Sequence, residues 1–377
     1  MRFRLALLLL PLLVLALPAT AQNRASLGGY GELHYNEVLD DGRAGQLDFH
    51  RFILYAGYNF NDWISFRSEL ELEHTLIEVE EGGAEGGEVA LEQAYVDLRP
   101  SRAFGVRAGL MLVPVGLINP VHEPPTFNGV ERPRVAQLLI PTTWRENGIG
   151  IVGRLANGLS YEAYLMAGLD PYEVEDGEVE AELSPTGGIA EAPQDGFKSS
   201  VDNLAWTARL DYQATLNLSI GGSLYHSGLS SDARFGDALD GVRFTLLEGH
   251  AQYNRGGLQS RAVVVYSTIS NADVLNDSDL VEANVGASQL GGYLELGYDV
   301  LPFLAPGTSQ QLVSFVRYEP FDTALSEANA QANRTDYTVG LTYKPTSQVA
   351  FKADLQWFTD GTDTTTRRLN LGVGYNF

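Results

Sequence analysis

The chain has 377 residues with a formal net charge of −23, and it contains 40 Gly, 18 Tyr and 16 Phe but no Cys. The absence of Cys excludes disulfides, thiolate metal sites and cysteine nucleophiles. An acidic chain without a basic run is not expected to bind nucleic acid. The length allows two ordinary domains or one large closed sheet, and the Gly and aromatic content favours the sheet.

Residues 1–21 have the pattern of a secretory signal peptide. Arg2 and Arg4 precede an apolar stretch over residues 5–17, and Ala19-Thr20-Ala21 forms an A-x-A cleavage pattern. We therefore predict that residues 1–21 are cleaved and that residues 22–377 form a single domain. No later stretch reaches the eighteen or so consecutive apolar residues of a membrane-spanning helix.

After residue 22, apolar and polar residues alternate with period two, which is typical of strands with one apolar face. Residues 63–75 and 349–358 are clear cases. A charge near the middle of a bilayer costs roughly 2 to 4 kcal/mol, so the polar face is expected to border a water-filled interior. The residues predicted to line this lumen include Arg51, Arg67, Glu69, Glu71, Arg107, Arg154, Arg209, Lys352 and Asp354.

Sixteen segments follow this pattern, and the connections between them are alternately short and long. The predicted strands are residues 26–38, 46–60, 63–79, 88–99, 102–113, 146–155, 158–168, 201–213, 216–228, 241–254, 257–270, 287–300, 309–320, 334–344, 348–359 and 365–377. An even number places both chain ends on the short-turn side, as in barrels inserted from the periplasm. We predict an all-β, transmembrane, antiparallel up-and-down β-barrel. A soluble β-sandwich is the alternative, but its core would have to contain many carboxylates.

The connection at residues 114–145 is unusual because it is apolar and contains six Pro. Such a segment cannot form a strand or a long helix, and it needs a surface to pack on. We predict that it folds into the barrel and narrows the pore, with an outer cap or subunit contact as the alternative. The predicted constriction residues are His122, Glu123, Glu131, Arg132, Arg134 and Arg145.

Several short motifs in this region carry a family resemblance. They are Gly-Leu-Met-Leu-Val-Pro-Val-Gly at residues 109–116, His-Glu-Pro-Pro-Thr-Phe at 122–127, Val-Glu-Arg-Pro at 130–133 and Ile-Pro-Thr-Thr-Trp at 140–144. With them the chain resembles the phosphate-selective porin O and P family. The resemblance implies a sixteen-stranded, homotrimeric porin with an inward loop. It also implies an arginine ladder with lysines near the constriction, but residues 114–145 contain no lysine.

Two further patterns are discounted as catalytic or cofactor motifs. Residues 148–153 match G-x-G-x-x-G, but they lie within a predicted strand and no helix follows. The six His are scattered in the sequence, so no zinc ligand set is apparent. We predict no metal, no cofactor and no enzymatic activity.

Long connections at residues 80–88 and 169–200 are acidic. Glu80, Glu81, Glu85 and Glu88 crowd the first of them. They are expected to form a solvated rim, or to bridge lipopolysaccharide phosphates through Ca²⁺ or Mg²⁺, which prefer oxygen ligands.

The final segment ends the sequence on an aromatic residue after strict alternation. This is typical of the closing strand of a Gram-negative outer-membrane barrel, with Tyr375 and Phe377 as the assembly signal read by the barrel assembly machinery. We expect a protein embedded in outer-membrane lipid and lipopolysaccharide that allows passive diffusion of ions and small polar solutes, with anions such as phosphate among them. A structural or adhesive barrel that binds divalent cations or surface ligands through its acidic loops is the alternative.

Overall fold

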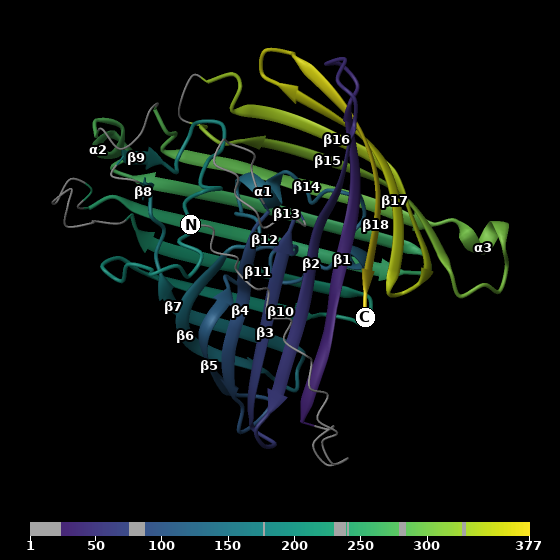
Figure 1. The fold of residues 1–377 in the computed structure, drawn as a ribbon, viewed down its shortest axis with the longest axis horizontal. Helices are drawn as coiled ribbons and strands as arrows, with labels where there is room; N and C mark the ends of the chain where they lie inside the picture. The colour runs from purple at the N-terminus through teal and green to yellow at the C-terminus, as the bar shows by residue number, and fades with distance from the viewer. Residues whose placement is uncertain are drawn as a thin grey trace, which may run out of the picture.

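The computed structural model describes residues 24–74, 87–175, 178–229, 239, 241–278, 284–325 and 329–377. The predicted signal peptide and the acidic residues Glu80, Glu81 and Glu85 lie outside these ranges. Within the described residues, sixteen strands form a closed barrel in which all paired neighbours are antiparallel (Figure 1). The predicted fold class and strand number are confirmed.

The predicted segments match the barrel strands to within a few residues at the described boundaries, and residues 75–79 of the third predicted strand lie outside the described residues. The strands are β1 (Ala25–Val38), β2 (Gln46–Asn59), β3 (Ile64–Glu73), β4 (Val89–Leu98), β5 (Gly105–Leu112), β6 (Arg145–Arg154), β7 (Leu159–Ala167), β10 (Leu204–Gln213), β11 (Leu218–Gly228), β12 (Arg243–Arg255), β13 (Leu258–Ser270), β14 (Ser288–Asp299), β15 (Gln311–Asp322), β16 (Asn333–Thr346), β17 (Val349–Asp360) and β18 (Thr365–Asn376).

The remaining elements lie in the connections. They are η1 (Pro124–Thr126), α1 (Val135–Leu138), α2 (Ala272–Asn276), α3 (Leu301–Leu304) and a hairpin of β8 (Tyr172–Glu175) and β9 (Glu178–Ala181). The hairpin was not predicted. None of the helices in the described ranges is long and apolar enough to cross a membrane.

The strands define a short-turn end and a long-loop end of the barrel. Turns such as residues 60–63, 155–158 and 256–257 lie at the first, and the connections 113–144 and 168–203 begin at the second. The helix α3 protrudes at the short-turn end, whereas α2 and the β8–β9 hairpin lie at the opposite end (Figure 1). This alternation of connection lengths agrees with the prediction.

The barrel closes where the first strand meets the last. The β1–β18 pairing runs from Tyr30 opposite Asn376 to Val38 opposite Arg368. Phe377 donates its N–H to the carbonyl of Gly29 at 2.9 Å and accepts from the Gly29 N–H at 3.0 Å. The predicted closing strand therefore continues the hydrogen-bond ladder to the last residue.

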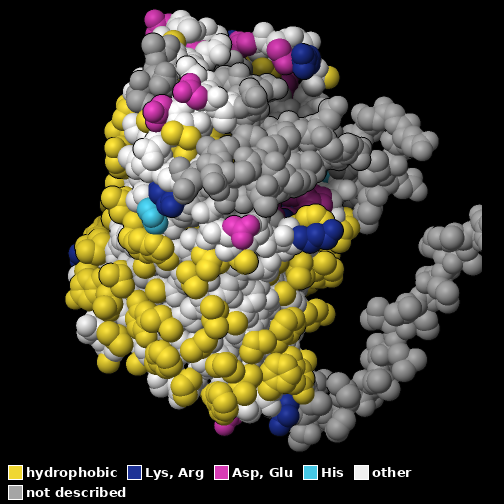
Figure 2. Space-filling model, turned by 90° about the vertical axis from the view of Figure 1, so that its left-hand side faces the viewer, with side chains coloured by type: hydrophobic (Ala, Val, Ile, Leu, Met, Phe, Trp, Pro, Cys, Tyr) yellow, Lys and Arg dark blue, Asp and Glu magenta, His cyan; other side chains and the backbone are white. Residues whose placement is uncertain are grey.

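The outer face of the barrel is apolar. On neighbouring strands Leu247, Val264 and Leu294 point outward and are 53%, 56% and 46% exposed. Figure 2 shows hydrophobic side chains as a broad belt over the wall, with most charged side chains near its two ends. Because exposed apolar side chains of this extent are unfavourable in water, the belt is suited to contact with lipid.

The inner face is not uniformly polar, and this corrects the expectation that every strand borders water. Around β6 to β14, inward apolar side chains pack against residues of the 113–144 connection in one cluster. Members from the wall are Val152, Met166, Tyr225, Phe244, Leu246, Val263, Val265 and Ile269, and members from the connection include Leu139, Ile140 and Trp144. This side of the barrel is filled, because the long connection buries its own apolar residues against the wall.

Candidate functional site

The connection between β5 and β6 folds into the barrel, and we call residues 113–144 the inward loop. Its helix α1 contacts β14, and η1 contacts β1, β17 and β18. A Cβ built at Gly374 would lie 2.2 Å from the Cβ of Pro124, and one at Gly372 would lie 3.0 Å from Val130. The small residues on the inner face of β18 thus allow the loop to approach the wall closely.

Charged side chains of the wall hold the backbone of the inward loop. Asp354 accepts the Val130 N–H at 2.7 Å, and Lys344 Nζ donates to the Pro125 carbonyl at 2.7 Å. Further donors to loop carbonyls are Arg317 to Asn128 at 2.6 Å, Arg261 to Thr126 at 2.5 Å, and Arg209 to Gly116. Hydrogen bonds from charged groups are worth about 1.5 to 3 kcal/mol each, so these contacts fix the loop in place.

The remaining polar sector, on β1–β5 and β16–β18, contains cavities at three heights. The middle one, which we call the constriction cavity, has a volume of about 190 Å³. It is lined by Glu32, His34, His50, Arg51, Glu73, Phe127, Val130, Glu131, Arg132, Gln137 and Thr142. Acidic and basic groups therefore face each other across a narrow space between the wall and the inward loop.

Close contacts order the charges of the constriction cavity. Arg51 Nε lies 2.5 Å from Glu32 Oε1, and His34 bridges Glu32 at 3.1 Å and Glu131 at 3.3 Å. Burial alone would raise the pKa of Glu131, but the hydrogen bond and charge of His34, the charge of Arg368 and a hydrogen bond from Asn36 outweigh it. Together they lower the pKa of Glu131 to about 2. Glu131 is therefore a fixed negative charge at neutral pH.

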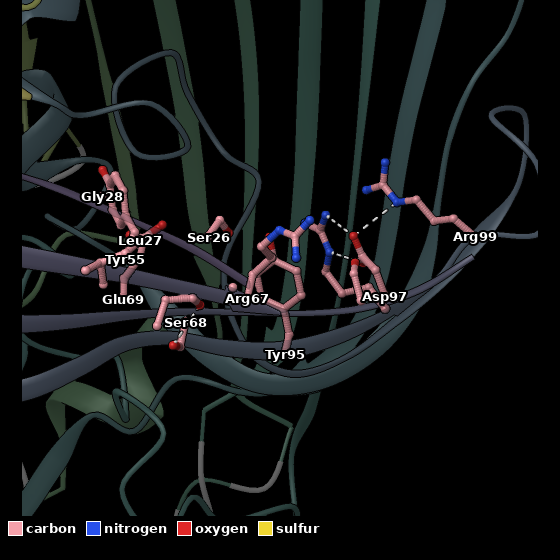
Figure 3. A pocket seen from close by; sticks show the side chains of 14 residues that line it. Ser26, Leu27, Gly28, Tyr55, Arg67, Ser68, Glu69, Tyr95, Asp97 and Arg99 are labelled. Atoms are coloured by element: carbon pink, nitrogen blue, oxygen red, sulfur yellow. Dashed lines mark hydrogen bonds and ion pairs between the residues drawn. The ribbon is translucent and has the colours of Figure 1, made fainter. Parts of the chain in front are cut away.

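The cavity at the short-turn end has a volume of about 560 Å³. Figure 3 shows Asp97 beside Arg99, with Tyr95 and Arg67 nearby, and Arg99 Nε lies 3.1 Å from Asp97 Oδ2. Arg107 donates to both oxygens of Asp97 at 2.8 and 3.2 Å, and its guanidinium lies 4.2 Å from the Tyr95 ring centre. Three arginines here outnumber the carboxylates Glu69 and Asp97.

The cavity at the long-loop end has a volume of about 540 Å³ and is lined by three arginines, which we call the mouth arginines: Arg134, Arg334 and Arg368. Arg134 and Arg368 lie 5.9 and 5.2 Å from the ring centre of Phe358. Burial, then the positive charge of Arg334, lowers the pKa of Arg134. Among the described residues that line this cavity, Asp360 is the single carboxylate.

The predicted constriction residues are distributed over several places. Glu131 and Arg132 line the constriction cavity, and Arg134 lines the long-loop cavity. His122 is buried, with Nε2 3.5 Å from Glu92, and its chain neighbour Glu123 is the residue preceding η1. Arg145 lies 3.6 Å from Asp195, at the start of β6. Half of the predicted set thus lines cavities, and these three residues are divided between two of them.

The predicted lumen residues also divide into two groups. Arg51, Arg67, Glu69 and Arg107 line cavities. Two others contact side chains of the wall: Glu71 lies 3.8 Å from Arg51, and Arg154 donates a hydrogen bond to Ser160 at 3.2 Å. The remaining three contact the inward loop: Arg209 donates to the Gly116 carbonyl, Asp354 accepts the Val130 N–H, and Lys352 Nζ lies 3.8 Å from the Phe127 ring centre. The prediction missed Glu32, His34 and His50, although the alternation of Tyr30, Glu32 and His34 is visible in the sequence.

No family model matches the chain. The fold is that of outer-membrane porins. OmpF of Salmonella typhi in complex with daunomycin superposes with a TM-score of 0.58 at 12% identity over 94% of this chain and 97% of that one. The anion-selective porin of Comamonas acidovorans gives 0.57 at 14%, covering 94% and 99%, and the channel DcaP of Acinetobacter baumannii gives 0.57 at 11%, covering 94% and 97%.

In sequence, the chain is 37% identical over 341 residues to an uncharacterized protein of Aquifex aeolicus (strain VF5). The alignment covers 87% of this chain and 74% of that protein. The chain belongs to the same family as this protein.

Proposed function

We propose that the protein is an outer-membrane channel through which ions and small hydrophilic solutes diffuse passively. The observation that carries this proposal is the inward loop. It crosses a porin-fold barrel and leaves charged cavities on one side of the lumen. No energy source is required, because solutes would move down their gradients past fixed charges.

The route we propose follows the polar sector only. The opposite side is filled by the apolar cluster around Trp144 and Tyr225, so solutes would pass between the inward loop and β1–β5 and β16–β18. A path limited to one sector predicts a small conductance compared with a barrel whose whole cross-section is open. We further propose that the exported protein resides in the outer membrane as a homotrimer, surrounded by lipid and lipopolysaccharide.

The charges favour a preference for anions at the two ends of this route. The mouth arginines outnumber Asp360 at the long-loop end, and Arg67, Arg99 and Arg107 outnumber Glu69 and Asp97 at the other end. The constriction cavity is mixed, so the overall preference should be weak. The resemblance to the porin O and P family suggests selectivity for phosphate. That selectivity would require lysines near the constriction, and residues 114–145 contain none.

Single-channel recording in planar bilayers tests the proposal. We expect small stepwise conductance, and a larger one when Val121 to Leu139 are deleted, because the deletion removes the segment that narrows the lumen. The absence of any stepwise current from correctly folded protein would contradict the channel function. Unchanged conductance in the deletion variant would contradict the role of the inward loop. Strong block by micromolar phosphate would instead indicate phosphate selectivity.

A further inference from the structure

Three of the six His of the chain lie together on the inner wall, although they are separated in the sequence. His34 lies on β1, His50 on β2, and His74 directly after the end of β3. The His34 and His50 rings are stacked with centres 4.6 Å apart, and His50 and His74 meet edge to face at 5.4 Å. The fold thus brings together three histidines that are scattered in the sequence.

Two irregularities of the backbone direct His50 and His74 toward Asp48. The β1–β2 register shifts between Glu32, opposite Arg51, and His34, opposite Asp48, so β2 contains one extra residue at this point. Such a bulge redirects side chains. His74 has a φ of 50°, in the left-handed region, and its N–H is bonded to the His50 carbonyl at 3.0 Å. Without this turn, alternation would place His74 on the outer face, next to Glu73 on the inner one.

The resulting arrangement centres on one carboxylate oxygen. Asp48 Oδ2 lies 3.3 Å from His50 Nδ1 and 2.8 Å from His74 Nδ1. One ligand atom from each of the three residues lies within 4.8 Å of the others. The side chains of His50, Asp48 and His74 are 33%, 32% and 49% exposed, so an ion could reach them from water.

We propose that Asp48, His50 and His74 form a binding site for a divalent transition metal ion, with Zn²⁺ as the probe. Two imidazoles and one carboxylate are a usual protein ligand set for zinc, with water in the fourth position. The ion would replace the hydrogen bonds that now join the two imidazole Nδ1 atoms to Asp48. Imidazole ligands favour Zn²⁺, Ni²⁺ or Cu²⁺ over Ca²⁺ and Mg²⁺, which prefer oxygen.

His34 would support the site without binding the ion. Its two ring nitrogens already face Glu32 and Glu131, and its ring stacks on His50. This contact holds the His50 ring in an orientation in which Nδ1 points at Asp48.

Metal binding should also change ion flow, an effect that rests on the proposed channel function. His50 lines the constriction cavity, so a bound cation would add positive charge beside Glu32 and Glu73. We expect Zn²⁺ to lower the permeability to cations relative to anions.

Calorimetric titration of the purified, folded barrel with ZnCl₂ tests the binding itself and needs no channel activity. We expect binding of Zn²⁺ that is weakened at least about tenfold in His74→Gln, His50→Gln and Asp48→Asn. His226→Gln is the matched control, because His226 contacts Thr245 and Trp206 elsewhere on the barrel. The half-exposed His74 makes its variant the least prone to folding defects.

A second cluster in the described residues, Glu69, Glu92 and His122, has ligand atoms within the same distance of one another and serves as the competitor. Zinc binding that is unchanged in His74→Gln and His50→Gln but lost in His122→Gln would overturn the proposal, as would the absence of binding to the wild-type protein. If binding follows the prediction but no current is seen with or without Zn²⁺, the metal site stands and the channel function fails.

Discussion

The carboxylate of Asp354 on β17 accepts the backbone N–H of Val130 in the inward loop at 2.7 Å, joining residues 224 positions apart in the chain. The other oxygen of Asp354 accepts from Asn370 at 2.6 Å. One side chain thus connects the loop to two strands of the wall.

Replacing Asp354 with Ala should loosen the inward loop. The buried Val130 N–H would lose its partner, which costs about 1 to 3 kcal/mol. We expect noisier single-channel currents with additional conductance levels. Asp336→Ala is the control, because Asp336 is a buried carboxylate of β16. Among the described residues, it makes no hydrogen bond to the inward loop. Equal noise in both variants would show that charge, and not the bond to Val130, is responsible.

The selectivity contributed by Glu131 should not depend on pH between 8 and 4. Its pKa of about 2 lies below the ordinary value of about 4.3, so the folded protein holds Glu131 ionised over this range. The stabilisation from its contacts is present above about pH 4.3 and is lost as the pH falls toward 2. Reversal potentials of the wild type and Glu131→Gln measure this. A difference between them that shrinks already between pH 7 and 5 would contradict the assignment.

Neutralising the mouth arginines should shift permeability toward cations. Each positive charge about 4 Å from an ion contributes about 1 kcal/mol in water, so the loss of one such interaction corresponds to about a fivefold lower ratio of chloride to potassium permeability. Arg134→Gln combined with Arg368→Gln is the test, measured as reversal potential in a KCl gradient. Arg43→Gln removes a charge from a side chain that is 87% exposed and should have little effect.

Truncating Trp144 should destabilise the filled side of the barrel. Trp144 is fully buried, and its ring centre lies 4.4 Å from that of Tyr225. Replacing a buried Trp with Ala typically costs about 3 to 5 kcal/mol. Denaturant unfolding of the barrel in lipid vesicles should show this loss. Trp206→Ala, at an outward position that is 48% exposed, should cost less. Similar losses for the two variants would argue against a packed interior.

Phe377→Ala should reduce the amount of assembled barrel. The backbone of Phe377 completes the ladder with Gly29, and its ring stacks on Phe52 with centres 6.2 Å apart. Heat-modifiable migration of membrane fractions on gels measures the folded fraction. Phe303→Ala changes an exposed aromatic residue of α3 and is the control. Undiminished assembly of Phe377→Ala would remove the support for a terminal assembly signal.

The barrel could be predicted because alternation with period two is a local property of each strand. The segment around residues 241–254 shows where this fails. The alternation of apolar and polar residues changes phase near Phe244 in the sequence, yet the pairing of β12 with β11 is continuous. The cause is the inner face itself, which is apolar at Phe244 and Leu246, opposite the inward loop, and polar at Glu248 and His250.

The candidate site was less predictable. The inward course of residues 114–145 followed from their Pro and apolar content, but the wall partners of each loop residue depend on contacts between segments up to 224 positions apart. The His cluster depends on a bulge and a left-handed residue, both of which interrupt the period on which the prediction relied.

The seam between β1 and β18 has a consequence for the order of events during biogenesis. Residues 30–38 find their partners only at residues 368–376, so the ring stays open until residues 368–376 have been synthesised. Until then two strand edges remain unpaired, and such edges readily associate with other chains. Closure is therefore a late, long-range step, and the folding chain depends on protection of both edges until that step is complete.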